Sequence, residues 1–93
     1  MYDLEIKPTA DKIFKKLSKK NKKQLIMIHK KIQEIRSNPQ HEYKHLRPPL
    51  QNFSRVHINS HFVLIFNIDD TEEIVTIYYF GWIFLFIFVH MHM

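Results

Sequence analysis

Three short runs of β-branched and aromatic residues between positions 53 and 80 constrain the fold of this 93-residue chain more than any other feature. The runs cover residues 53–58, 62–68 and 74–80, and short polar segments separate them. Such runs are typical of antiparallel strands joined by tight turns. The sequence therefore predicts a three-stranded meander at the centre of the fold.

The first of these runs has two different faces. Val56 and Ile58 fall on one side of the strand, whereas Arg55 and His57 fall on the other, because successive side chains of a strand point in opposite directions. Residues 62–66 are apolar on both faces, as expected for a central strand that is covered on both sides. We therefore expect a rigid strand that displays two basic side chains beside a buried central strand.

Residues 8–37 predict two helices that form a hairpin. Pro8 suits the first position of a helix, since its missing N–H would have no intrahelical partner there. Asn21 and Gln24 have the spacing of a capping box at a break between the helices, and Pro39 ends the second one. Apolar residues recur at helical spacing in both segments, at Ala10, Ile13, Phe14 and Leu17 and then at Leu25, Ile28, Ile32 and Ile35.

The remaining segments complete an α+β prediction. Residues 2–6 alternate apolar and acidic, which indicates a short N-terminal strand. Residues 38–52 are expected to form a loop, because adjacent prolines at 48 and 49 exclude a central strand. We expect an N-terminal strand and an antiparallel helix hairpin packed on a three- to four-stranded, mainly antiparallel sheet. The predicted domain covers residues 1–81, and residues 82–93 form an atypical apolar tail.

The charge of the chain is unevenly distributed. Residues 1–40 hold eleven Lys and Arg against four acids, whereas residues 41–93 hold three against five. A basic half of this kind predicts binding to a polyanion or to an acidic partner segment, although a solvated lysine-rich helix face has the same composition. The absence of cysteine excludes disulfides and thiolate metal sites. The first residues do not read as a signal peptide, so a cytoplasmic location is expected.

The order and the residue sequences of several segments resemble those of the RelE/ParE superfamily, the toxins of type II toxin–antitoxin systems. The similarity is closest to the archaeal RelE-like members and spans about residues 2–81. The matching pieces are Tyr2-Asp-Leu-Glu-Ile6 before the Pro8 helix, the Lys-rich hairpin ending in Ser37-Asn38-Pro39, His45-Leu46-Arg47, Phe53-Ser-Arg-Val-His-Ile58, Val63-Leu-Ile-Phe66 and Tyr78-Tyr-Phe-Gly81.

This resemblance implies an activity. RelE-like toxins are mRNA interferases that cleave messenger RNA in the ribosomal A site, without a metal or another cofactor, by attack of a ribose 2′-hydroxyl on the adjacent phosphate. The 2′-hydroxyl also distinguishes RNA from DNA as a substrate. Carried over to this sequence, the candidate catalytic residues are Arg47, Arg55, His57 and His61. The candidate RNA-binding residues are Lys15, Lys16, Lys19, Lys20, Lys22, Lys23, Lys44 and His45.

The resemblance also implies partners. They are a cognate RelB-like antitoxin that covers the sheet and the helix hairpin, the ribosome with its messenger RNA, and operator DNA reached only through the antitoxin. A membrane is not expected among them. Two alternatives stay open, namely a catalytically inactive fold retained for antitoxin binding and autoregulation, and a ParE-like inhibitor of gyrase.

The sequence departs from the family pattern at two places. Val63 stands where many members have an arginine, and Gly81 is followed by Trp82 in place of the usual His or Arg and later Tyr. Either the tail has replaced the usual C-terminus and impairs the nuclease, or Trp82 supplies base stacking with His90 or His92 as the acid.

The apolar tail itself has three interpretations. It covers the core, fills a groove of the toxin–antitoxin interface, or contacts a membrane. Residues 74–89 are shorter than the about 20 residues that a membrane-spanning helix needs. The two histidines at 90 and 92 lack a third ligand for a metal site.

Overall fold

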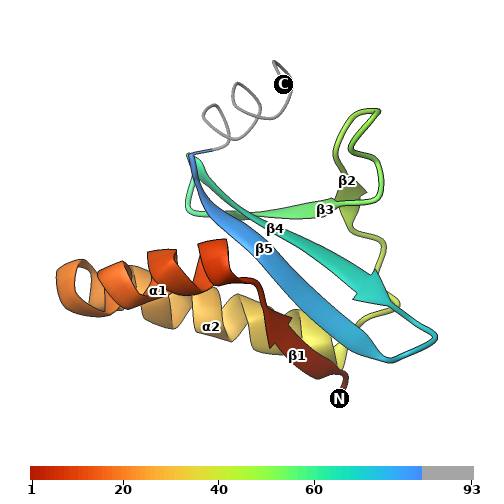
Figure 1. Ribbon diagram of the computed structural model, residues 1–93, viewed down its shortest axis with the longest axis horizontal. Coiled ribbons are helices and arrows are strands. Elements are labelled where there is room, and N and C mark those ends of the chain that lie inside the picture. The colour runs from red at the N-terminus through yellow and green to blue at the C-terminus, as the bar shows by residue number, and fades with distance from the viewer. Residues whose placement is uncertain (83–93) are drawn as a thin grey trace.

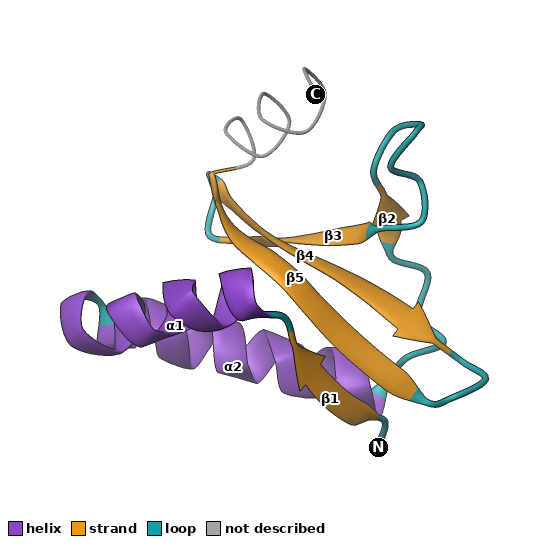
Figure 2. Ribbon diagram, viewed as in Figure 1, coloured by secondary structure: helices purple, strands orange, loops and turns teal. Residues whose placement is uncertain are grey.

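The computed structural model of the chain describes residues 1–82 and shows two helices packed on one face of a five-stranded sheet (Figures 1 and 2). The strands lie in the order β1-β5-β4-β3-β2, with β1 parallel to β5 and the other pairs antiparallel. The predicted α+β fold is confirmed. In chain order the elements are β1 (Asp3–Ile6), α1 (Pro8–Lys20), α2 (Lys22–Ser37), β2 (Lys44–His45), β3 (Ser54–Ile58), β4 (Phe62–Asp69) and β5 (Ile74–Trp82).

The sheet is larger than the sequence predicted, because the expected loop 38–52 contains the short strand β2. Lys44 and His45 pair with Arg55 and Ser54 of β3 before the two prolines begin. The N–H of Leu46, the residue after β2, donates to the carbonyl of Phe53, the residue before β3, at 2.9 Å. At the other end of the chain, β5 continues one residue beyond the predicted boundary at 81. His90 and His92, considered above as a catalytic acid or as metal ligands, lie with the rest of residues 83–93 outside the described residues.

The helix hairpin forms where the local signals place it. Pro8 is the first residue of α1, and Asn21 separates the two helices. The N–H of Asn21 donates to the carbonyl of Leu17 at 2.8 Å, while its side-chain oxygen accepts from the N–H of Gln24 at 3.1 Å. One residue thus ends α1 and caps α2. Within residues 1–82, no helix has the length and apolar character to cross a membrane.

The main core lies between the helices and the sheet face that they cover (Figure 1). Leu64 and Phe66 of β4 are fully buried there, and Phe62 packs at its margin, as the sequence predicted for this strand. The predicted helix stripes supply the other side. The buried residues of this core are Ala10, Ile28, Ile32, Ile35, Ile58, Leu64, Phe66, Val75, Ile77 and Phe80.

A second, smaller core lies on the opposite face of the sheet, which we call the outer face. Val63 and Ile65 of β4 are buried there together with Leu46, which follows β2. Leu50, Phe53, Tyr78 and Tyr79 pack around them. Strand β4 is therefore covered on both faces, as its apolar sequence predicted, and the segment 46–53 is attached to the outer face.

Candidate functional site

Two cations lie directly opposite each other on the outer face. Lys44 of β2 pairs with Arg55 of β3 in antiparallel register, and Arg55 pairs in turn with Ile65 of β4. Residues opposed in this way point to the same face, with Cβ atoms about 4.5–5.5 Å apart. Since Ile65 belongs to the outer cluster, both cations project away from the helices.

His57 extends this row along β3. It lies two positions beyond Arg55 and pairs with Val63, which pairs with Gly81 of β5. A two-residue step along a strand is about 7 Å, so the imidazole and the guanidinium rise side by side from one rigid strand. His57 is exposed and Arg55 is half-buried. The predicted common face for Arg55 and His57 is confirmed, and we call Lys44, Arg55 and His57 the basic row.

The other two predicted catalytic residues lie at the margins of this face. Arg47 is exposed in the segment after β2, and its carbonyl accepts from the N–H of Leu50 at 2.9 Å. His61 lies in the β3–β4 turn, and its ring stacks on Trp82 with centroids 5.8 Å apart. His61 is two residues from Val63, the partner of His57, and four residues from Ile65, the partner of Arg55. Along the strand direction it therefore lies about 7 Å beyond His57 and about 13 Å beyond Arg55.

The predicted RNA-binding lysines of the helices lie in a different part of the molecule. All six are exposed and gather where α1 ends and α2 begins, at Lys15, Lys16, Lys19, Lys20, Lys22 and Lys23. Lys15 also pairs with Asp11, at 3.0 Å. The helices cover the sheet face opposite the outer face, and their shared tip is far from β2 (Figure 1). The structure thus separates this hairpin tip from the basic row.

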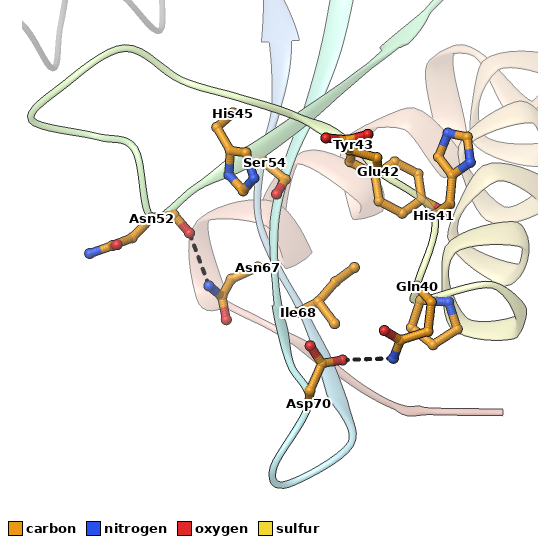
Figure 3. Close-up of a pocket in the computed structure, with 11 residues that line it drawn as sticks. Gln40, His41, Glu42, Tyr43, His45, Asn52, Ser54, Asn67, Ile68 and Asp70 are labelled. Carbon is orange, nitrogen blue, oxygen red and sulfur yellow. Dashed lines mark hydrogen bonds between the residues drawn. The ribbon is translucent and has the colours of Figure 1, made fainter.

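His45 also lies apart from Lys44, because adjacent residues of β2 point in opposite directions. It lines a polar hollow of about 270 Å³ beside β2 (Figure 3). In that hollow the side-chain amide of Asn67 donates to the carbonyl of Asn52 at 3.0 Å. The carboxylates of Glu42 and Asp70 also line it, so the hollow suits a phosphate less well than the basic row does.

Asp70 has a structural role at the edge of the same hollow. Its carboxylate accepts a hydrogen bond from the hydroxyl of Tyr2 at 2.9 Å. It accepts another from the side-chain amide of Gln40 at 3.3 Å (Figure 3). The hydrogen bond from Tyr2 to Asp70 raises the pKa of the Tyr2 phenol. The contacts join the N-terminus, the segment after α2 and the β4–β5 turn. Among residues 1–82, no group of three His, Asp or Glu is arranged to hold a metal ion.

An apolar groove opens between β1 and the helices, on the side of the molecule away from the basic row. It has a volume of about 360 Å³. Ile26 is 67% exposed beside it, and Met27 next in the chain is 39% exposed. This surface was not predicted from the sequence, although four consecutive apolar residues at 25–28 exceed what one buried helix stripe needs. The groove is lined by Leu4, Ile6, Phe14, Leu25, Ile26, Ile28, His29 and Ile32.

Comparison with known proteins gives consistent results. A family model described as the ParE toxin of the type II toxin–antitoxin system parDE matches residues 4–81. RelE4, a candidate toxin of Methanocaldococcus jannaschii, is 53% identical to this chain over 75 residues. That match covers 81% of this chain and 79% of the relative.

Solved structures of the same shape come from bacteria. The YoeB–YefM complex from Staphylococcus aureus matches with a TM-score of 0.76 and 21% identity, over 88% of this chain and 97% of that chain. The intact RelBE toxin–antitoxin complex of E. coli matches with a TM-score of 0.70 and 19% identity, over 88% of this chain and 96% of that chain. At such identities the likeness shows a common fold.

Proposed function

Because the chain belongs to the RelE/ParE family of type II toxins, we propose that it cleaves messenger RNA in the A site of the ribosome. The observation that carries this proposal is the pairing of Lys44 with Arg55. Like charges directly opposite each other destabilise a sheet. A bound phosphate group removes that cost, and RNA supplies phosphates along its backbone. The basic row is then an anion site that is incomplete without its substrate.

The proposed chemistry uses the three side chains of the basic row. His57 takes the proton from the ribose 2′-hydroxyl, whose oxygen attacks the adjacent phosphorus. The bond from phosphorus to the 5′-oxygen breaks, which leaves a 2′,3′-cyclic phosphate, and the 5′-oxygen takes up a proton from water to become a 5′-hydroxyl. Lys44 and Arg55 stabilise the negative charge that develops on the phosphoryl oxygens. A proton transfer by one placed group contributes about 10²–10⁴-fold to a rate.

The test is cleavage of a short messenger RNA on programmed ribosomes, mapped by primer extension. Arg55→Gln and His57→Gln should each lower the cleavage rate at least about 100-fold. Lys12→Gln and His29→Gln remove a cation and an imidazole from exposed helix positions and should leave the rate unchanged. Wild-type protein that breaks DNA through gyrase and spares messenger RNA would replace this proposal with the ParE-like function.

In this proposal the lysines of the hairpin tip make a second contact with an anion. Its six exposed lysines would bind ribosomal RNA and hold the toxin while the basic row acts. Each phosphate contact should then weaken ribosome binding by about 0.7–0.9 log units for each tenfold rise in salt. The double change Lys19→Gln and Lys20→Gln should lower that slope by about 1.4–1.8 units. Ribosome affinity that does not respond to salt would exclude this role.

We propose that the cognate antitoxin occupies the apolar groove between β1 and the helices. The groove is lined mainly by apolar side chains, which suits the apolar stripe of an amphipathic segment. Exposed Lys22, Lys23 and Lys30 of α2 lie on the same helix as the groove-lining residues and favour acidic side chains beside that stripe.

Ile26 gives a sharp test of this docking surface, because it is mostly exposed in the free protein. Ile26→Asp should weaken antitoxin binding about 10- to 100-fold with little change in thermal stability. Lys12→Gln on the other helix is the control. Calorimetric titration that gives the wild-type affinity for Ile26→Asp would move the antitoxin to another surface.

A further inference from the structure

Two neighbouring residue pairs join β2 to β3, and they face opposite sides of the sheet. Lys44 pairs with Arg55 on the outer face, and at the next position His45 pairs with Ser54. Ser54 pairs in turn with Phe66 of the main core, so the side chains of this second pair point to the helix side. The same short ladder therefore presents two cations on one face and two hydrogen-bonding groups on the other.

The hydroxyl of Ser54 is the most informative group on the helix side. Ser54 is only 6% exposed, yet it lines the polar hollow beside β2, and its oxygen points into that hollow (Figure 3). Within residues 1–82 this hydroxyl has no hydrogen-bond partner, whereas every fully buried polar side-chain atom has one. A hydroxyl that is largely removed from water without gaining a partner costs free energy. A polar ligand in the hollow would remove that cost.

The other walls of the hollow suit one flat heteroaromatic ring. Tyr43 and Ile68 supply apolar surface, while Gln40 and Asn67 bring side-chain amides. The volume of about 270 Å³ lies just below the range of about 300–1,000 Å³ for pockets that hold drug-sized ligands, so a smaller ligand fits. Unstacked bases of single-stranded RNA are recognised by apolar or aromatic walls together with hydrogen bonds to their edges. The lining of the hollow combines these two properties.

The charges of the hollow discriminate among the bases. Its two carboxylates, Glu42 and Asp70, accept hydrogen bonds from N–H groups and repel a carbonyl oxygen. Asp70 already accepts from Tyr2 and Gln40. Glu42 has no hydrogen bond or ion pair with any of the described residues 1–82, so its carboxylate is available to a ligand. The hollow therefore favours a base that carries an amino group over uracil, which presents two carbonyl oxygens.

We propose that the hollow is a base-recognition site, which takes a nucleobase with an exocyclic amino group from the RNA whose phosphate lies on the basic row. The inference rests on the proposed ribonuclease function and adds substrate specificity to it. Strand β2 is the edge strand of the sheet and has only two residues, so an RNA chain can turn around it from one face to the other. Ser54 and His45 then contact the edge of the base, and Glu42 accepts from its amino group.

The test uses the free protein and probes that lack the 2′-hydroxyl and so resist cleavage. The probes are a dinucleotide of deoxycytidine, a dinucleotide of deoxyuridine and the abasic analogue with the same phosphate. Cytosine and uracil have the same ring, but cytosine has an amino group where uracil has a carbonyl oxygen. Nuclear magnetic resonance titrations follow the backbone amides of the hollow and of the basic row separately. The site of binding and the affinity are thus measured without any enzymatic assay.

We expect the deoxycytidine probe to shift resonances of the hollow and to bind about 10-fold more tightly than the deoxyuridine probe. Ser54→Ala should weaken its binding about 3- to 10-fold and unfold within about 2 °C of wild type, because the hydroxyl has no partner to lose. Glu42→Gln should bring the affinities of the two probes close together. The matched control is Ser60→Ala in the exposed β3–β4 turn, which should bind both probes like wild type.

The outcomes separate this inference from the function on which it rests. Shifts confined to the basic row, or equal affinities for the three probes, overturn the base site and leave the ribonuclease to the cleavage test. Equal losses in Ser54→Ala and Ser60→Ala also overturn it. Hollow resonances that respond to the cognate antitoxin and to no probe assign the hollow to that protein instead. Wild type that cleaves no messenger RNA on ribosomes overturns the proposed function, and with it the claim that the bound base belongs to a substrate.

Discussion

Removal of either cation of the Lys44–Arg55 pair should stabilise the free protein. Like charges directly opposite each other in a sheet cost about 0.2–1 kcal/mol, and partial exposure of this pair places it near the middle of that range. For a domain of 60–100 residues, 1 kcal/mol shifts the melting temperature by about 4–8 °C. Lys44→Gln and Arg55→Gln should therefore each raise the melting temperature by about 2–4 °C, while Arg55→Gln also lowers the rate of the proposed cleavage at least about 100-fold.

A double-mutant cycle followed by thermal unfolding isolates the repulsion, since Arg55 also packs its aliphatic stem. Arg55→Gln should raise the melting temperature less in the Lys44→Gln background than in wild type. The gain should also vanish in 1 M salt, because the screening length falls from about 10 Å at 0.1 M to about 3 Å. Lys12→Gln on α1 controls for the loss of net charge alone. Additive effects, or a gain that persists in 1 M salt, would refute the claim that this pair is strained without an anion.

Three further predictions concern the scaffold. Asn21→Ala should lower the free energy of unfolding by about 1 kcal/mol in denaturant titrations, because the cap on Gln24 is lost, whereas Asn21→Asp should retain it. Leu46→Ala should cost about 2–3 kcal/mol and slow cleavage, since Leu46 holds segment 46–53 on the outer face; an unchanged unfolding midpoint would contradict this. Burial raises the pKa of Tyr43 and Tyr79 above the ordinary value of 10.0, so folded protein keeps protons that the unfolded chain releases. The contribution of these two phenols to the free energy of unfolding should be fully present below pH 10.0 and be lost as the pH rises through their folded-state pKa values. Tyr43→Phe should reduce the loss of unfolding free energy measured in urea titrations.

The sequence predicted those parts of the fold whose signals are local. Pro8 fixes the start of α1 through its missing N–H and restricted backbone, and Asn21 caps α2 through one hydrogen bond, so both signals are local to the chain. The two faces of β3 follow from strict alternation over five residues, which placed Arg55 and His57 together. The role of these residues in cleavage stays a prediction, since their placement alone does not test it.

What the sequence did not reveal depends on pairing between distant strands. Strand β5 has a bulge at Tyr78 that arises from its register on β4, and alternation counted along β5 alone assigns Phe80 to the wrong face. Strand β2 exists only because β3 pairs with it. The sequence also grouped His45 and the helix lysines with Lys44, since proximity along the chain and a common charge do not show which layer a side chain occupies.

The layered fold has a consequence for how the proposed toxin could be controlled. The basic row lies on the outer face, while the apolar groove lies at the edge of the helix layer, and β4 between them is buried on both sides. A partner that fills only the groove leaves the basic row uncovered and blocks cleavage by excluding the toxin from the ribosome. A partner that neutralises the basic row directly must also reach around the sheet and bring carboxylates to Lys44 and Arg55. In the second case the antitoxin affinity of Arg55→Gln falls and depends less on salt, whereas in the first case it equals that of wild type.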